Sequence, residues 1–77
     1  MDTPTIIKHY RGKTPLRNFA EQIGVSHAAV QQWESGTTEP TDERITAWIN
    51  DQRGWVSDMG RMLFLARNGQ TLKNLIK

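Results

Sequence analysis

The sequence predicts a small, mainly helical domain. The chain has 77 residues, which suffices for one domain with a small core. Its apolar and charged fractions, 36% and 23%, are typical of a chain that folds and stays in solution. Several glycines separate short segments whose apolar residues recur at helical spacing. We therefore expect about four short helices, followed by a C-terminal arm or β-hairpin.

Two start signals open the chain. Thr3-Pro4 predicts the first helix, because threonine caps helix N-termini well and proline suits the first helical position. Gly12 is the expected end, after apolar residues at Ile6, Ile7 and Tyr10. Thr14-Pro15 repeats the signal and Gly24 ends the second helix. The apolar stripe of this second helix consists of Leu16, Phe19, Ala20 and Ile23.

Two further helices are expected between residues 26 and 54. Ser26 is a candidate cap for the third helix and Gly36 a candidate end. Its buried face would be Ala29, Val30 and Trp33. Thr41 is a candidate cap for the fourth helix, which Gly54 would break. The fourth helix has acidic residues in its first turn and an apolar stripe at Ile45, Trp48 and Ile49.

Residues 55–77 carry a weaker pattern. Asn68-Gly69 between apolar runs is a signal for a type I′ hairpin, although the run before it also fits a helix that ends at Gly69. We favour an arm or hairpin. From Gly60 onwards the chain has four basic residues and no acidic one, whereas residues 1–40 are electrically neutral. We therefore divide the chain into a helical domain, 1–54, and a basic C-terminal segment, 55–77.

The second and third helices form a candidate helix-turn-helix over residues 16–35. Two short helices joined by a tight turn that contains glycine are typical of this DNA-binding motif. The motif needs a small residue where the helices cross, a glycine in the turn and a branched residue that packs back. Ala20, Gly24 and Val30 stand at those positions. A generic helical hairpin is the simpler alternative.

The same segment resembles a known family. The run from Leu16 to Gly36, with Trp33-Glu34-x-Gly36 at its end and Pro40 after it, resembles the Cro/CI (XRE) class of phage and bacterial regulators. The segment Thr5–Tyr10 is similar to the short first helix of lambda-type Cro proteins. The resemblance covers roughly residues 3 to 50 and implies a lambda-repressor-like helical fold.

The resemblance implies a set of DNA contacts. In this class the second helix of the motif lies in the major groove of double-stranded DNA. The residues expected to contact bases are His27, Ala28, Gln31 and Gln32. The residues expected to contact phosphates are Lys8, Lys13, Arg17 and Ser26, although Ser26 serves better as a helix cap. Gln32 suits a bidentate bond with adenine, and His27 suits a guanine acceptor or a phosphate.

Two functions follow from these observations. The first is a Cro-like transcription regulator, such as a repressor, that binds an operator as a homodimer. The second is a regulator that uses the motif as a scaffold and binds RNA polymerase or a sigma factor. Leu16, where the family usually has a polar residue that contacts phosphate, favours the second. The residues expected on the dimer or partner surface are Trp55, Arg61, Phe64, Arg67 and Lys73.

Other classes of protein are not expected. The chain has no cysteine, no metal-binding histidine spacing and no glycine-rich phosphate loop, so we predict no enzyme activity, metal or cofactor. The longest apolar run, Met62 to Ala66, is far too short to span a membrane, and the N-terminus carries no secretory signal. We expect the protein in the cytoplasm of a bacterium or a phage-infected host cell.

Overall fold

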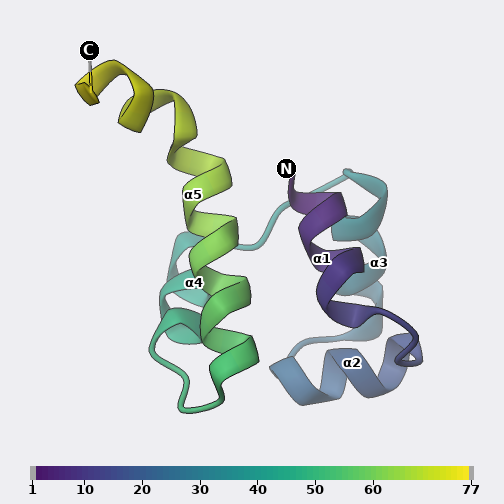
Figure 1. The fold of residues 1–77 in the computed structure, drawn as a ribbon. Helices are drawn as coiled ribbons and strands as arrows, with labels where there is room; N and C mark the ends of the chain where they lie inside the picture. The colour runs from purple at the N-terminus through teal and green to yellow at the C-terminus, as the bar shows by residue number, and fades with distance from the viewer. Residues whose placement is uncertain (1, 77) are drawn as a thin grey trace.

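The structure, a computed structural model, describes the backbone of residues 2–76 and the side chains of residues 2–68. Within these residues the fold is entirely helical (Figure 1). The helices in chain order are α1 (Thr3–Arg11), α2 (Leu16–Ile23), α3 (His27–Ser35), α4 (Asp42–Ile49) and α5 (Gly54–Ile76). The expectation of a small, mainly helical domain is confirmed.

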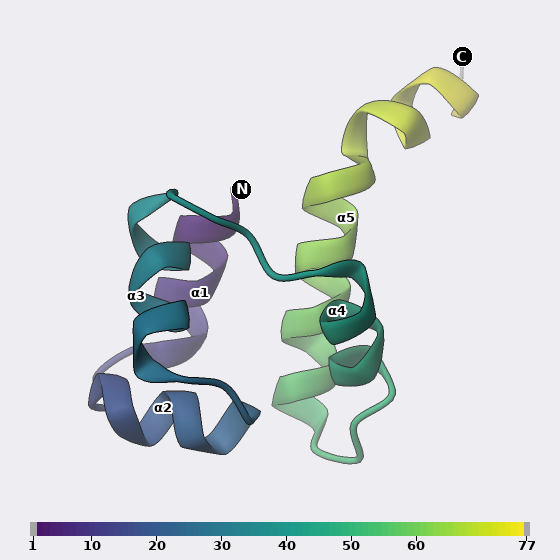
Figure 2. The ribbon, with the colours of Figure 1, turned by 180° about the vertical axis from the view of Figure 1, so that it is seen from behind.

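The helices form two neighbouring groups. Helices α1 and α3 lie side by side, and α2 crosses one end of this pair (Figure 1). Helix α4 packs against α5, and the segment that follows α3 links the two groups (Figure 2). Helix α1 also contacts α5. The end of α5 extends beyond the other helices.

The first two helices begin differently from the sequence prediction. Asp2, not Thr3, caps α1, and its carboxylate accepts a hydrogen bond from the Thr5 amide at 3.0 Å. Thr3 is instead buried, and its hydroxyl donates to the Glu39 carboxylate at 2.8 Å. Helix α2 has no side-chain cap, because Pro15 itself occupies the cap position. The predicted start of α1 is one residue too late, and that of α2 is one residue too early. Both differences have the same reason, because capping depends on backbone angles that residue type alone does not determine.

The other cap signals are confirmed. Ser26 accepts from the Ala29 amide at 3.1 Å, and Thr41 accepts from the Arg44 amide at 3.3 Å. Gly24 and Gly36 end α2 and α3 in the left-handed conformation, which favours glycine. Helix α4 ends earlier than predicted, at Ile49, and Gly54 begins α5 instead of ending α4.

The predicted C-terminal arm or hairpin is wrong. Residues 54–76 form one helix, and Asn68-Gly69 lies inside it. The Asn68 amide nitrogen donates to the Phe64 carbonyl at 3.0 Å, so its side chain supports the helix rather than a turn. Val56, Met59 and Leu63 recur at helical spacing and are almost fully buried. The burial of this face stabilises the part of the helix that precedes the turn signal.

One core joins both groups of helices. Trp33 and Trp48 meet edge to face, with ring centroids 5.7 Å apart. The predicted assignment of both tryptophans to the core is confirmed. The buried apolar residues are Ile6, Ile7, Phe19, Ala20, Ile23, Val30, Trp33, Ile45, Trp48, Val56, Met59 and Leu63. The first half of α5 therefore shares the core of the residues before it.

Candidate nucleic-acid interface

Helix α3 has a buried side and an exposed side. Val30 and Trp33 are 0% and 5% exposed and anchor the helix in the core. The other side carries every residue for which the sequence predicted a base contact, and all of them are exposed: His27, Ala28, Gln31 and Gln32. Ser26 is also exposed, but its hydroxyl is used as the helix cap. Helix α3 therefore exposes a mainly polar face, while its opposite side is packed in the core.

The acidic residue of α3 does not belong to this face. Glu34 is only partly exposed and forms a two-pronged ion pair with Arg11 of α1, at 2.6 and 3.0 Å. The hydrogen bonds with Glu34 raise the pKa of the Arg11 guanidinium. Because the carboxylate is neutralised at the contact between α1 and α3, it does not repel a DNA phosphate in front of α3.

The loop after α3 contacts the end of its exposed face. The Thr38 hydroxyl donates to the Gln32 side-chain oxygen at 3.4 Å, which is a long and weak hydrogen bond. The hydroxyls of Ser35 and Thr37 are 2.9 Å apart. A bidentate bond from Gln32 to adenine uses both amide atoms, and the amide oxygen keeps a second lone pair for the bond from Thr38.

A shallow hollow lies between α2 and the start of α3. It has a volume of about 500 Å³ and brings together Arg17, Ser26 and His27, three residues that the sequence predicted for DNA contact. Glu21 also lines it, so one acidic group lies beside the arginine. Lys8 and Lys13 are exposed on α1 and in the loop before α2, but neither lines this hollow.

Comparison with protein families agrees with this geometry. A family model described as helix-turn-helix matches residues 7–51, which is more than half of the chain. The chain belongs to the XRE-type helix-turn-helix family. It is therefore a DNA-binding transcription regulator, and the predicted family and fold are confirmed. Comparison with curated proteins found no significant match, and comparison with solved structures found none either.

In this helix-turn-helix protein, the residues predicted for a dimer or partner surface lie in different environments. Trp55 is half-buried and packs against Phe19 of α2, with ring centroids 6.0 Å apart. Arg61 and Phe64 are exposed on α5. Arg67 pairs with Asp42 and also donates to the Pro40 carbonyl, so it ties α5 to the start of α4. The side chain of Lys73 lies outside the described residues.

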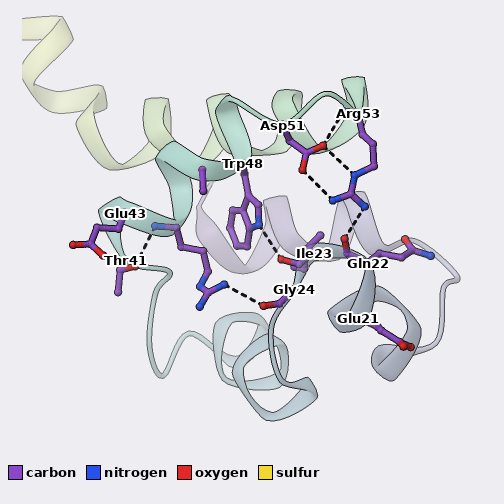
Figure 3. Close-up of a pocket in the computed structure, with 11 residues that line it drawn as sticks. Glu21, Gln22, Ile23, Gly24, Thr41, Glu43, Trp48, Asp51 and Arg53 are labelled. Carbon is purple, nitrogen blue, oxygen red and sulfur yellow. Dashed lines mark hydrogen bonds and ion pairs between the residues drawn. The ribbon is translucent and has the colours of Figure 1, made fainter.

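The sequence did not predict the contacts at the far end of α2. A cleft of about 480 Å³ lies where α2 meets α4 and the loop that follows α4 (Figure 3). Three side chains from that region donate hydrogen bonds to the last carbonyls of α2 and to the turn. They are Arg44, Trp48 and Arg53. No local sequence pattern links these donors to their acceptors, which lie 20 to 31 residues away.

The described part of the chain shows neither a metal-binding cluster nor a membrane-spanning helix. Among residues 2–68, no group of three or more histidine and acidic side chains is placed to hold a metal ion. None of the helices in the described part of the chain has the length and apolar character needed to cross a membrane. Residues 2–68 contain eight basic and eight acidic residues. The described part of the chain as a whole therefore carries no net charge, while three of the predicted phosphate contacts, Lys8, Lys13 and Arg17, are basic and exposed.

Proposed function

We propose that the protein binds a pseudo-palindromic operator as a homodimer, with α3 in the major groove, and represses transcription there. The observation that carries the proposal is the exposed face of α3. Its polar side chains, His27, Gln31 and Gln32, stand on a helix that Val30 and Trp33 hold in the core. A helix that reads base edges needs both features, because hydrogen bonds to bases are directional.

The expected contacts divide into base reading and positioning. Gln32 would bond adenine through both amide atoms, and His27 would donate to guanine or to a phosphate. Ala28 is small enough to contact a thymine methyl group. Arg17 would hold a phosphate in the hollow beside His27, and Lys8, Lys13 and Ser26 would add further backbone contacts. These assignments follow the resemblance and the exposure of each side chain.

The charge balance supports a dimer. Neutralisation of phosphates supplies most non-specific affinity for DNA, and one chain has a formal net charge of only +2 to provide it. Two copies on adjacent half-sites, about 10 base pairs apart, would add the specific contacts of two recognition helices. Phe64 and Leu65 on α5 are 48% and 47% exposed and would bury apolar surface between the copies.

A second candidate function rests on Leu16 and on α5. Leu16 is half-buried against the core and offers no group for a phosphate. The exposed Phe64 and Leu65, with Arg61 one turn away, would also suit a protein partner such as RNA polymerase or a sigma factor. Either function would place the protein in the cytoplasm.

The first experiment is selection from a random pool of DNA duplexes at physiological salt, with the full chain, followed by sequencing. We expect a pseudo-palindrome with half-sites one helical turn apart. The matched control is the H27A/Q31A/Q32A variant, whose altered residues are all exposed, so that its helical content and melting temperature should remain. If the wild type and the triple variant enrich the same sequences equally, α3 does not read the bases and the proposal is overturned.

The second arm of the experiment separates the two functions. If the full chain shows only weak, salt-sensitive binding to all duplexes, the operator proposal fails. Binding to purified RNA polymerase, measured with and without the sigma factor, would then support the alternative. Loss of that binding in an F64S/L65S variant would assign the contact to α5, since both side chains lie outside the core.

A further inference from the structure

We propose that Arg53, held in place by Asp51, is a positioning residue for the recognition helix α3. It would act through the C-terminal end of α2, from which the turn to α3 begins. The inference rests on the function proposed above, and it goes further by assigning a role in recognition to a residue outside the helix-turn-helix.

The last carbonyls of α2 are satisfied in two different ways. The amide of Gly24 donates to the Glu21 carbonyl at 3.2 Å, and the amide of Val25 donates to the Ala20 carbonyl at 2.9 Å. These two bonds form the local motif that ends many helices at a glycine. They leave three consecutive carbonyls, at residues 22 to 24, without a local backbone partner.

Distant side chains supply the three missing donors. Arg53 Nη1 lies 2.6 Å from the Gln22 oxygen. The Trp48 indole nitrogen lies 3.1 Å from the Ile23 oxygen, and Arg44 Nη1 lies 3.3 Å from the Gly24 oxygen. Figure 3 shows Trp48 reaching the end of α2 from α4, and Arg53 reaching it from the loop after α4. The turn between α2 and α3 is thus held from outside as well as by its own backbone.

Of the three donors, Arg53 is the one whose removal should change the position of α3 without unfolding the domain. Trp48 is 4% exposed and packs on Trp33, so its removal would damage the core. The bond from Arg44 is the longest of the three. Arg53 is exposed and makes the shortest bond, and its positive charge lies at the negative end of α2, a helix with no basic residue in its own last turn.

Asp51 holds Arg53 in the geometry that this bond requires. Its two carboxylate oxygens accept from Arg53 Nε and Nη2, each at 3.0 Å. This two-pronged pair leaves Nη1 free to reach Gln22. The hydrogen bonds from Arg53 also lower the pKa of the Asp51 carboxyl, which keeps it ionised. The guanidinium lies over the Trp55 ring, 5.7 Å from its centroid, and Trp55 packs on Phe19 of α2.

The short turn explains how this contact would reach the DNA. Only Gly24, Val25 and Ser26 separate α2 from α3. A change in the direction of the last turn of α2 therefore moves the start of α3, where His27 and Ala28 stand. Because base contacts tolerate little displacement, loss of the Arg53 bond would weaken operator binding more than non-specific binding.

The test compares R53A, R53K and D51N with Q52A, which changes the exposed neighbour of Arg53 as a matched control. We expect R53A to lower operator affinity roughly tenfold, because the free protein then populates the binding-competent position of α3 less often, with an unchanged salt slope. R53K and D51N should show part of this loss, since a lysine cannot form the same fork of bonds. Equal operator affinity of R53A and Q52A would overturn the inference. So would a salt slope reduced by about one unit, which would make Arg53 a phosphate contact.

Amide hydrogen exchange provides a readout that does not depend on DNA. In R53A, exchange should become faster at the amides of Gly24 and Val25 and at the Trp48 indole, and stay unchanged in α1. If random-duplex selection finds no operator, the proposed function fails, but this measurement still decides the inference. Exchange at the turn equal to that of Q52A would show that Arg53 does not hold the turn.

Discussion

Helices α3 and α5 both pack one side into the core, but their outer sides differ in chemistry. The outer side of α3 offers His27, Gln31 and Gln32, all polar. The outer side of α5 offers Phe64 and Leu65, each about half exposed. Polar groups at fixed positions suit hydrogen bonds to base edges, whereas exposed apolar side chains gain free energy when another protein surface covers them. The comparison separates a polar outer face from an apolar one within one small domain, and the proposed functions assign the first to DNA and the second to protein.

The two helices also differ in how their positions are fixed. Ser26 and Gly36 cap α3 at its two ends, so its bounds depend on local chemistry. Helix α5 depends on close contact with α4, where Gly60 faces the backbone of Ile49. A Cβ atom at Gly60 would lie 2.8 Å from the Ile49 nitrogen, so only glycine permits this approach. Four predictions test this comparison, in order of expected effect.

The largest effect is expected for the buried side of α5. Leu63→Ala should lower the free energy of unfolding by about 2–5 kcal/mol, because Leu63 is 1% exposed and its removal leaves a cavity. Leu65→Ala is the matched control on the outer side, with an expected change within about 0.5 kcal/mol. Urea denaturation measures both. Similar losses for the two variants would show that the two sides of α5 are not distinct in solution.

A smaller loss is expected at the contact between α4 and α5. Gly60→Ala should destabilise the protein by about 1–3 kcal/mol through overpacking against Ile49. This outweighs the gain of about 1 kcal/mol that alanine brings to a helix interior. Thermal unfolding provides the measurement, and Gly54→Ala, where an added Cβ meets nothing within 4 Å, is the control. A melting temperature above that of the wild type would mean that α4 and α5 separate easily.

The outer face of α3 should affect specificity and not stability. Gln32→Ala should cost about 1–3 kcal/mol in binding to the selected operator and relax the preference at one base position. Gln52→Ala, in the exposed loop before α5, is the control and should bind like the wild type. Titration against operators that vary at single positions measures the effect. An equal loss on every sequence would assign Gln32 to the DNA backbone instead.

The smallest effect is expected for a single phosphate contact. Arg17→Ala should weaken binding to all duplexes alike and reduce the salt slope by about one unit, because one fewer counterion is released. Asn18→Ala, at the exposed neighbour of Arg17 on α2, should leave the slope as it is. Binding is measured over a range of salt concentrations. A salt slope identical to that of the wild type would show that Arg17 contacts no phosphate in the hollow beside His27.

Local signals in the sequence predicted the region that carries the DNA-binding motif. Ser26, Gly24 and Gly36 define α2, the turn and α3 because capping and left-handed backbone involve only neighbouring residues. The periodic apolar residues predicted the buried side of α3, and hence its exposed side. The family resemblance added roles for the exposed residues, which stay predictions.

Tertiary structure decided the rest. Asn68-Gly69 reads locally as a hairpin turn, but the chain continues through it as a helix, whose first half is stabilised by burial of Val56, Met59 and Leu63 against the other helices. The contact between Arg53 and Gln22 spans 31 residues, and it exists only after α4 has packed on the end of α2. The sequence by itself determined where the recognition helix begins and ends, since those signals act within a few residues. How that helix is held depends on contacts between distant segments, which only the packed structure brings together.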